Sequence, residues 1–542
     1  MTFYTMRPLF TFFLCCIFCI NLPLFAAIKA LDPDEKSITL AITNEPPKLN
    51  SIISTDATSF MLLDHLTEGL MGYDQNGKLT GGVAEKWQLT EKKAHFWLKR
   101  NALWNDGKPV TAHDFITAWR EVLKPETASA YAFILYPIAN AETINQGKLP
   151  PTALGVKAIN DYELEIILER PTPYFLELTA FNTYRPIRAD ALAKWGRAYA
   201  ADADKMLFNG PFILTEWTHG ASLSLEKNTS YWNANAVNLE HIHIPYLTSD
   251  STALFNLFLE ERIATWIRPA IGANDIKKAL KKHLEMKKFQ NGAVWYLEFN
   301  HRPDRITSNL NLRKAIQSFF DPVIFANKVI GNPGNKPTYS IFPSWLKGAE
   351  KKLAEEYPPK IIHPNLETAK YYLEKAKAEL GLEKIPALTL LLDDNPNANK
   401  LGEYFQTILT ENLGIELKID KQIFKQRLQK SRAGDFDLLF AGWGPDYNDP
   451  MTFADLFASW NQNNRGQFKD PMYDTLITEA QAITDQNRRA AIFGQLQTIL
   501  SDKAVILPAY ESGDIYVQNP GLKNVKRQVI GGDPIFTYAE IE

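Results

Sequence analysis

Residues 441–450, with the sequence AGWGPDYNDP, bring together residue types suited to binding a cationic group. Trp443 and Tyr447 offer flat apolar walls with polar edges, and Gly442 lets the backbone come close to a ligand. Asp446 is a carboxylate among these aromatic residues, and a partly desolvated carboxylate needs a cation because an unpaired buried charge is costly. If no Lys or Arg of the chain supplies this cation, the amino group of a ligand can supply it.

Other roles remain open for this segment. Asp446 could cap a helix near residues 451–457 from a solvated loop, or Asp446 and Asp449 could act as the acid and base of a secreted hydrolase. The second role lacks an oriented nucleophile, and the chain has no G-x-S-x-G, Walker A or H-E-x-x-H motif. We expect no cofactor. His241 and His243 share a strand face without a third ligand nearby, so they predict a surface pair and not a metal site.

The elements before this segment predict how it is positioned. The residue pattern indicates alternating strands and helices at 387–392, 400–412, 415–419, 422–431 and 437–441. Strands that alternate with helices imply a parallel sheet with helices on its faces. Ligands bind such sheets beyond the carboxyl ends of the strands. The residues after Phe440 are therefore where function is expected.

The composition of the 542 residues is that of a globular protein large enough for several cores, with 45% hydrophobic and 22% charged residues. Lys and Arg total 59 against 62 Asp and Glu, a formal net charge of −3. This balance argues against a nucleic-acid partner, which would call for a basic surface.

The N-terminal residues 1–27 predict a cleavable signal peptide. Arg7 is the only charged residue before Lys29, residues 9–20 are almost entirely apolar, and small residues follow at the expected cleavage point near Ala26 or Ala27. A membrane anchor is the alternative, but it needs roughly 20 apolar residues. All three cysteines lie in this segment. We expect a cysteine-free mature protein, exported most simply to a bacterial periplasm.

One run of specific motifs lies near the start of the chain. It contains GVAEKW at residues 82–87, FWLKR at 96–100, WNDGKPV at 104–110 and DF at 114–115, and shorter motifs are LGVKA at 154–158, NGPF at 209–212 and YWN at 231–233. These motifs resemble those of the peptide-binding branch of the extracytoplasmic solute-binding proteins, family 5, which serve ABC importers.

This resemblance implies an α/β fold, a two-lobed periplasmic-binding-protein clamp of type II with an extra domain, whose mixed sheets carry helices on both faces. The implied boundaries are residues 28–67, 190–290 and 511–542 for lobe I, 68–189 for the extra domain and 291–510 for lobe II. The implied partners are short peptides and an inner-membrane ABC permease, with the receptor a monomer that performs no chemistry. The same clamp could instead hold dipeptides, murein peptides, metal chelates or oligosaccharides.

The resemblance also assigns roles to single residues. Asp446 resembles the carboxylate that pairs with the α-ammonium of the peptide, and Trp443, Tyr131 and Phe424 resemble the walls of side-chain pockets. The backbone that would pair with the peptide as a β-strand belongs to Thr55, Asp56 and Ala57. Such pairing gives affinity without reading the peptide sequence.

One position departs from the family pattern. Family members often carry an arginine for the peptide carboxylate directly before Ala-Gly-Trp, where this chain has Phe440. A second basic position is occupied here by Ser431, with Arg432 one residue later. Either Arg432 takes over this role or the ligand has no free carboxylate at that place.

Overall fold

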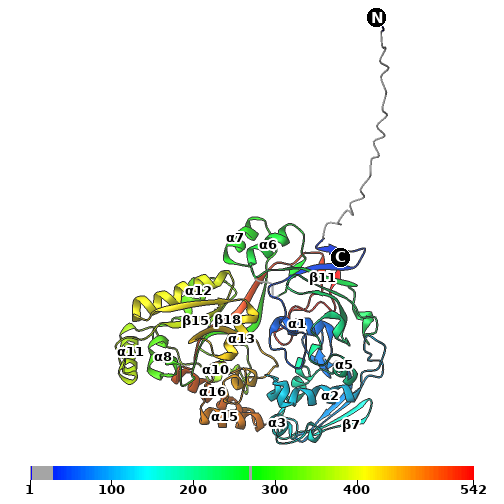
Figure 1. Ribbon diagram of the computed structural model, residues 1–542, viewed down its shortest axis with the longest axis horizontal. Coiled ribbons are helices and arrows are strands. Elements are labelled where there is room, and N and C mark those ends of the chain that lie inside the picture. The colour runs from blue at the N-terminus through cyan, green and yellow to red at the C-terminus, as the bar shows by residue number, and fades with distance from the viewer. Residues whose placement is uncertain (1, 3–28, 268–270) are drawn as a thin grey trace.

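The computed structural model describes residues 2, 29–267 and 271–542. Apart from Thr2, the predicted signal peptide lies outside these residues. Figure 1 shows two halves side by side, each with its own sheet and helices. Within the described part of the chain, no helix is both long and apolar enough to cross a bilayer.

The first half, called lobe I below, is built on a six-stranded sheet. Its strands run in the order β1-β2-β11-β10-β9, with β12 pairing on β2. Their bounds are Leu31–Asp32 (β1), Ser37–Ile42 (β2), Phe212–Thr218 (β9), Ser222–Lys227 (β10), His241–Leu247 (β11) and Thr265–Trp266 (β12). Every residue of β2 is buried, which fits its central place. The helices here are α1 (Ala57–Leu66), α6 (Ser251–Leu259) and α7 (Ala273–Lys281).

A second sheet belongs to the segment predicted as the extra domain. It is antiparallel and has four strands in the order β5-β6-β8-β7, whereas the sheet of lobe I is mixed because β2 pairs in parallel with β11 and β12. The strands of the second sheet are Ala84–Leu89 (β5), Lys93–Leu98 (β6), Val156–Asn160 (β7) and Glu163–Ile167 (β8), and the helices beside it are Ala112–Leu123 (α2), Ala141–Asn145 (α3), Phe175–Leu178 (α4) and Ala189–Trp195 (α5). Thr111 and Asp114 form a capping box at the start of α2, where the backbone N–H of Thr111 donates to the Asp114 carboxylate at 2.9 Å.

The other half, called lobe II, is built on a mixed sheet in the order β14-β18-β13-β17-β15-β16. The strands are Lys287–Phe299 (β13), Lys336–Pro337 (β14), Leu388–Asp393 (β15), Leu417–Gln422 (β16), Leu438–Trp443 (β17) and Ile506–Tyr516 (β18). The pairs β15–β16 and β15–β17 are parallel, which confirms the parallel sheet predicted from the sequence. The remaining pairs are antiparallel.

The helices of lobe II cover this mixed sheet. They are Leu310–Gln317 (α8), Pro322–Ile324 (α9), Leu353–Glu356 (α10), Leu366–Leu380 (α11), Pro396–Gln406 (α12), Phe424–Ala433 (α13), Met451–Ala454 (α14), Pro471–Ala482 (α15) and Gln486–Asp502 (α16). Two further short hairpin-like pairs are β3 (Met71–Tyr73) with β4 (Leu79–Gly81), and β19 (Leu522–Lys523) with β20 (Glu540–Ile541). The predicted mixed α/β class is confirmed.

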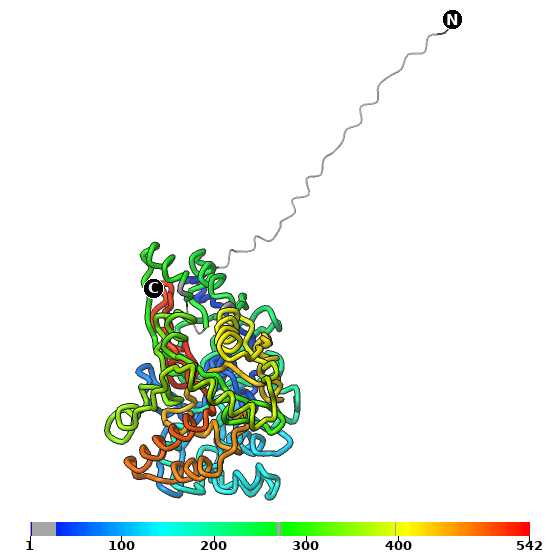
Figure 2. The backbone as a smooth tube through the Cα atoms, turned by 90° about the vertical axis from the view of Figure 1, so that its left-hand side faces the viewer, coloured from blue at the N-terminus to red at the C-terminus, as the bar shows by residue number. Residues whose placement is uncertain are grey.

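Two long antiparallel strands, β13 and β18, link the halves. They pair from Lys287 opposite Tyr516 to Glu298 opposite Ile506. In Figure 2 the green segment that contains β13 and the red segment near the C-terminus run next to each other. The domain boundaries drawn from the sequence at 290/291 and 510/511 fall inside these strands, and we keep those boundaries as a proposal.

We expect Trp119→Ala to lower the free energy of unfolding by about 3–5 kcal/mol, because it leaves a large cavity in the core of the extra domain. Trp119 is fully buried, and its indole N–H donates to the Tyr184 carbonyl at 2.9 Å. Urea denaturation followed by circular dichroism measures the change. Tyr371→Ala is the control, since Tyr371 is 56% exposed on α11. Equal effects of the two substitutions would contradict this description of the core.

Candidate ligand-binding site

The segment that carries Asp446 follows directly on β17, at the carboxyl end of that strand. The backbone N–H of Asp446 donates to the Thr452 hydroxyl at 2.9 Å, which ties the loop to α14. The backbone N–H of Met451 donates to Asp449 at 2.9 Å. Asp449 therefore accepts the hydrogen bond of the first backbone N–H of α14, and the carboxylate of Asp446 is free to bind another partner.

That partner is a tyrosine of the other half of the molecule. The Tyr131 hydroxyl lies 3.1 Å from each of the two carboxylate oxygens of Asp446, to which it donates. Tyr131 is 2% exposed. No Lys or Arg forms an ion pair with Asp446 within residues 29–267 and 271–542. Burial raises the pKa of Asp446 well above its usual range, and the Tyr131 hydrogen bond opposes this shift.

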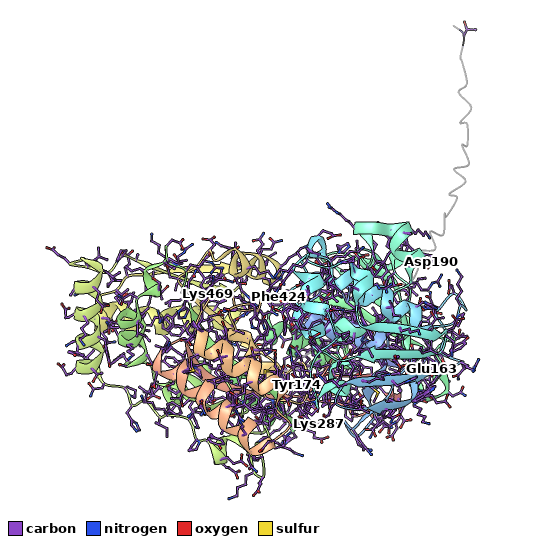
Figure 3. The ribbon with its side chains drawn as sticks, turned by 90° about the horizontal axis from the view of Figure 1, so that it is seen from below. Glu163, Tyr174, Asp190, Lys287, Phe424 and Lys469 are labelled. Atoms are coloured by element: carbon purple, nitrogen blue, oxygen red, sulfur yellow. The ribbon has the colours of Figure 1, made fainter. Side chains whose placement is uncertain are left out.

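Aromatic side chains from both halves surround this carboxylate. The Trp443 and Tyr131 rings lie 6.3 Å apart, and Tyr447 stacks on Tyr174 with ring centroids 5.6 Å apart and planes 6° apart. Figure 3 places Tyr174 at the boundary of the two halves. The buried indole N–H of Trp443 has no hydrogen-bond partner among the described residues. This N–H can therefore donate a hydrogen bond to a polar group of a ligand.

Asp449 is not available as a second catalytic acid. The guanidinium of Arg489 donates to both carboxylate oxygens of Asp449 at 2.6 Å, and both residues are buried. This bidentate pair holds the charge of Asp449 inside the protein. Asp446 and Asp449 consequently do not form the exposed acid–base pair that the hydrolase alternative needs.

The segment expected to pair with peptide backbone contains a helix start. The side chain of Asp56 caps α1 by accepting hydrogen bonds from the Ser59 N–H at 2.9 Å and the Ser59 hydroxyl at 2.7 Å. Ala57 is the first residue of α1. Thr55 precedes the cap, and its hydroxyl accepts a hydrogen bond from the Arg432 guanidinium in lobe II. The pairing role of these three residues stays a prediction.

Two of the other expected site residues have packing roles. A side chain at Gly442 would place its Cβ 2.8 Å from the indole of Trp295, so glycine is required here by that close approach. Phe424 begins α13, where its partly buried ring lies 5.1 Å from the Arg427 guanidinium. Figure 3 places Phe424 where the two halves meet.

Phe440 belongs to the apolar core of lobe II. Its ring contacts Phe325 at 5.4 Å and Trp295 at 5.8 Å between centroids. Residues of a strand alternate between the two sheet faces, so Phe440 and Trp443 point to opposite sides of β17. The two residues accordingly fall in different apolar clusters.

Sequence reasoning missed residues that only the folded chain brings to this place. Tyr174 stacks on Tyr447, and Phe181 lies 4.9 Å from Tyr131 between ring centroids. The dense aromatic residues at 174–184 are a usable signal for both.

Comparison with known proteins gives a consistent result. The family described as bacterial extracellular solute-binding proteins, family 5 Middle, matches residues 78–465. The oligopeptide-binding protein OppA of Bacillus subtilis (strain 168) is 31% identical over 498 residues, which cover 90% of each chain. The structure of Listeria monocytogenes OppA bound to peptide has a TM-score of 0.87 at 29% identity, covering 94% of this chain and 99% of that chain.

Two structures of a further relative bear on how the halves are placed. The Escherichia coli murein tripeptide binding protein MppA has a TM-score of 0.84 at 26% identity, covering 93% of this chain and 98% of that chain. An unliganded open form of MppA has a TM-score of 0.63 at 25% identity, covering 94% and 98%. The two halves of this chain are therefore placed less like those of the open form.

We expect Arg489→Ala to destabilise the fold by about 3–5 kcal/mol, because it leaves the buried carboxylate of Asp449 without its counterion. The neighbouring Arg488→Ala is a matched control, since Arg488 is exposed and pairs with Glu479 on the surface. This control should cost at most about 1 kcal/mol. Urea denaturation of both variants measures the difference, and equal losses would show that the Asp449 pair is not buried as described.

Proposed function

Because the chain belongs to family 5 of the bacterial extracellular solute-binding proteins, we propose that it captures short peptides between its lobes and delivers them to an ABC import permease. The observation that carries the proposal is the Asp446 carboxylate, which has Tyr131 as its partner across the lobe boundary and no cation of its own. The α-ammonium of a peptide supplies that missing charge.

Binding and closure are coupled through residues of both lobes. Tyr131 comes from the extra domain and Asp446 from the loop after β17, and the two side chains touch. A ligand that binds beside this contact reaches both sides only when the lobes are together. Such a ligand binds the closed arrangement more tightly than the open one and stabilises it by this difference in binding free energy. The two strands β13 and β18 are the connection about which the lobes would move.

The surroundings of Asp446 suit a receptor that accepts many side chains. Trp443, Tyr447 and Phe424 give apolar walls without a fixed set of polar groups. The segment before α1, where Asp56 has an extended backbone, can pair with peptide backbone. Backbone pairing and a charge at the amino terminus are common to all peptides. We infer binding by the main chain, with pockets that tolerate different side chains.

The place of action follows from the proposed export signal. Residues 1–27 would direct the chain out of the cytoplasm and be removed, leaving a monomeric receptor without cysteine in the periplasm. A relative supports this location. It is a protein of Salmonella typhimurium named a periplasmic oligopeptide-binding protein. The two chains are 32% identical over 453 residues, which cover 82% of this chain and 81% of the relative. The receptor role needs no cofactor and no reaction.

We expect Asp446→Ala to weaken the binding of trialanine by about 3–5 kcal/mol, because the α-ammonium then lies in a desolvated site without a counterion. Isothermal titration calorimetry on protein refolded free of bound ligand measures this. N-acetyl-trialanine, which lacks the positive charge of the α-ammonium, should bind the wild type poorly. Asp435→Ala is the control, since Asp435 is an exposed carboxylate of lobe II. Unchanged affinity of Asp446→Ala would refute the role of Asp446.

Peptide binding should strengthen with rising pH up to the pKa of free Asp446. Burial raises that pKa, and an ammonium ligand favours the ionised carboxylate, so binding below the pKa expels a proton. Affinity should therefore fall by up to about tenfold for each pH unit below it. Calorimetry between about pH 5 and 7.5, where the peptide amine stays protonated, tests this. An equal pH dependence in Asp446→Asn would contradict it.

A further inference from the structure

The helix pair α6 and α7, together with the start of β13, carries a basic surface that the proposed peptide site does not use. Its lysines are Lys277, Lys278, Lys281, Lys282, Lys287 and Lys288. All of them are exposed except Lys287, which is half-buried. Asp275 and Glu285 are the only acids between residues 273 and 288. Because the whole chain carries a formal net charge of −3, the rest of it is acidic, and positive charge is concentrated at this place.

The protein itself does not neutralise this charge. In the described part of the chain, the lysines of α7 form no ion pair. Lys278 donates to the uncharged side chain of Asn256 on α6 at 2.8 Å. Asp275 is 4% exposed and accepts from the Thr252 hydroxyl at 3.0 Å, so the acid of α7 points toward α6 and away from solvent. The lysines of α7 therefore remain available to an anionic partner.

Apolar side chains lie among these lysines. Leu280 of α7 is 58% exposed and lies next to Lys281 in the chain. The half-buried side chains of Phe258, Leu259 and Leu284 pack on the small apolar cluster beneath the two helices. A basic face that also carries exposed apolar side chains is typical of helices that lie on a membrane surface. The lysine stems can rest against apolar atoms while their ammonium groups reach lipid phosphates.

The start of the folded chain lies at the same end of the molecule. The backbone N–H of Ala30 donates to the Glu261 carbonyl, directly after α6, at 2.9 Å. Figure 1 shows α6 and α7 protruding at the top, beside the C-terminus. Residues 9–20 are the apolar stretch of the predicted signal peptide, and residues 21–29 reach at most about 30 Å when extended. As long as the signal peptide is attached and inserted, the basic surface therefore lies within reach of the bilayer.

We propose that this basic surface binds the anionic phospholipid headgroups of the membrane across which the chain is exported. Each lysine near such a membrane strengthens binding by a factor of about five, because the negative surface potential attracts it. The contact is peripheral, since no helix of the described residues is long and apolar enough to span a bilayer. The inference goes beyond the proposed function, because such binding would keep the receptor at the membrane that contains its permease.

The test measures co-sedimentation with vesicles of the protein produced from its full sequence and purified from the soluble fraction. One kind of vesicle is phosphatidylcholine alone, and the other contains about one third phosphatidylglycerol. The wild type should bind the anionic vesicles at about 50 mM salt and leave them at about 500 mM. The triple variant Lys277→Gln/Lys281→Gln/Lys282→Gln should bind them about 100-fold more weakly. Leu280→Ser should weaken binding by about threefold or more.

A second triple variant, Lys347→Gln/Lys351→Gln/Lys352→Gln, is the matched control, since it removes the same charge from exposed lysines of lobe II. Its binding to the anionic vesicles should stay within about twofold of the wild type. Circular dichroism checks that each variant is folded. If the α7 triple variant does not fold, Lys281→Gln alone should still weaken binding by about fivefold.

Equal binding of the α7 variant and the wild type, equal binding of both kinds of vesicle, or equal losses in the two triple variants would overturn the inference. A wild type that binds no vesicle would overturn it too, and salt-sensitive retention on heparin would then assign the basic surface to a soluble polyanion. These results are separate from the Asp446-dependent binding of peptides, which calorimetry measures without vesicles.

Discussion

The constraint on which the proposed site depends is a carboxylate, Asp446, that forms no ion pair with any Lys or Arg of the described residues. Asp446 lies among aromatic side chains, and the only group that reaches both of its oxygens in the described chain is the neutral Tyr131 hydroxyl. A hydroxyl stabilises a buried carboxylate less than an ammonium does, because it carries no net charge. In the proposed function a cationic group of the ligand supplies the missing charge, and this would link occupancy of the site to the position of the lobes.

The rest of lobe II holds this carboxylate in place. Thr452 binds the Asp446 backbone, and the Asp449–Arg489 pair anchors the following turn in the protein interior. The sequence alone allows Asp449 to act with Asp446 as the acid and base of a hydrolase, but Arg489 neutralises the charge of Asp449. Neighbouring acids thus have different roles, since one is paired inside the protein and the other is left for a ligand.

The extra domain contributes directly to the site. Its Tyr131 and Tyr174 meet Asp446 and Tyr447 of lobe II, and Arg170 donates to Gln481 at 2.7 Å further along the same boundary. The largest apolar cluster continues from lobe I and the extra domain into residues 443–500 of lobe II. The extra domain therefore packs directly against lobe II at the place where we propose that the ligand binds.

The alternation of β17 explains why Phe440 and Trp443 have different surroundings. One face of the strand packs Phe440 against Trp295 and Phe325, and the other face carries Trp443 toward the lobe boundary.

Local patterns in the sequence were enough to predict the parallel strands β15, β16 and β17, and Asp446 as the acid at a carboxyl strand end. These features depend on neighbours a few residues apart, where the hydrophobic period operates. The pairing of Asp449 with Arg489 and the contact of Tyr131 with Asp446 were decided by tertiary structure alone. Tyr131 and Asp446 are 315 positions apart, and whether a charged side chain finds a partner depends on which distant segments the fold brings beside it.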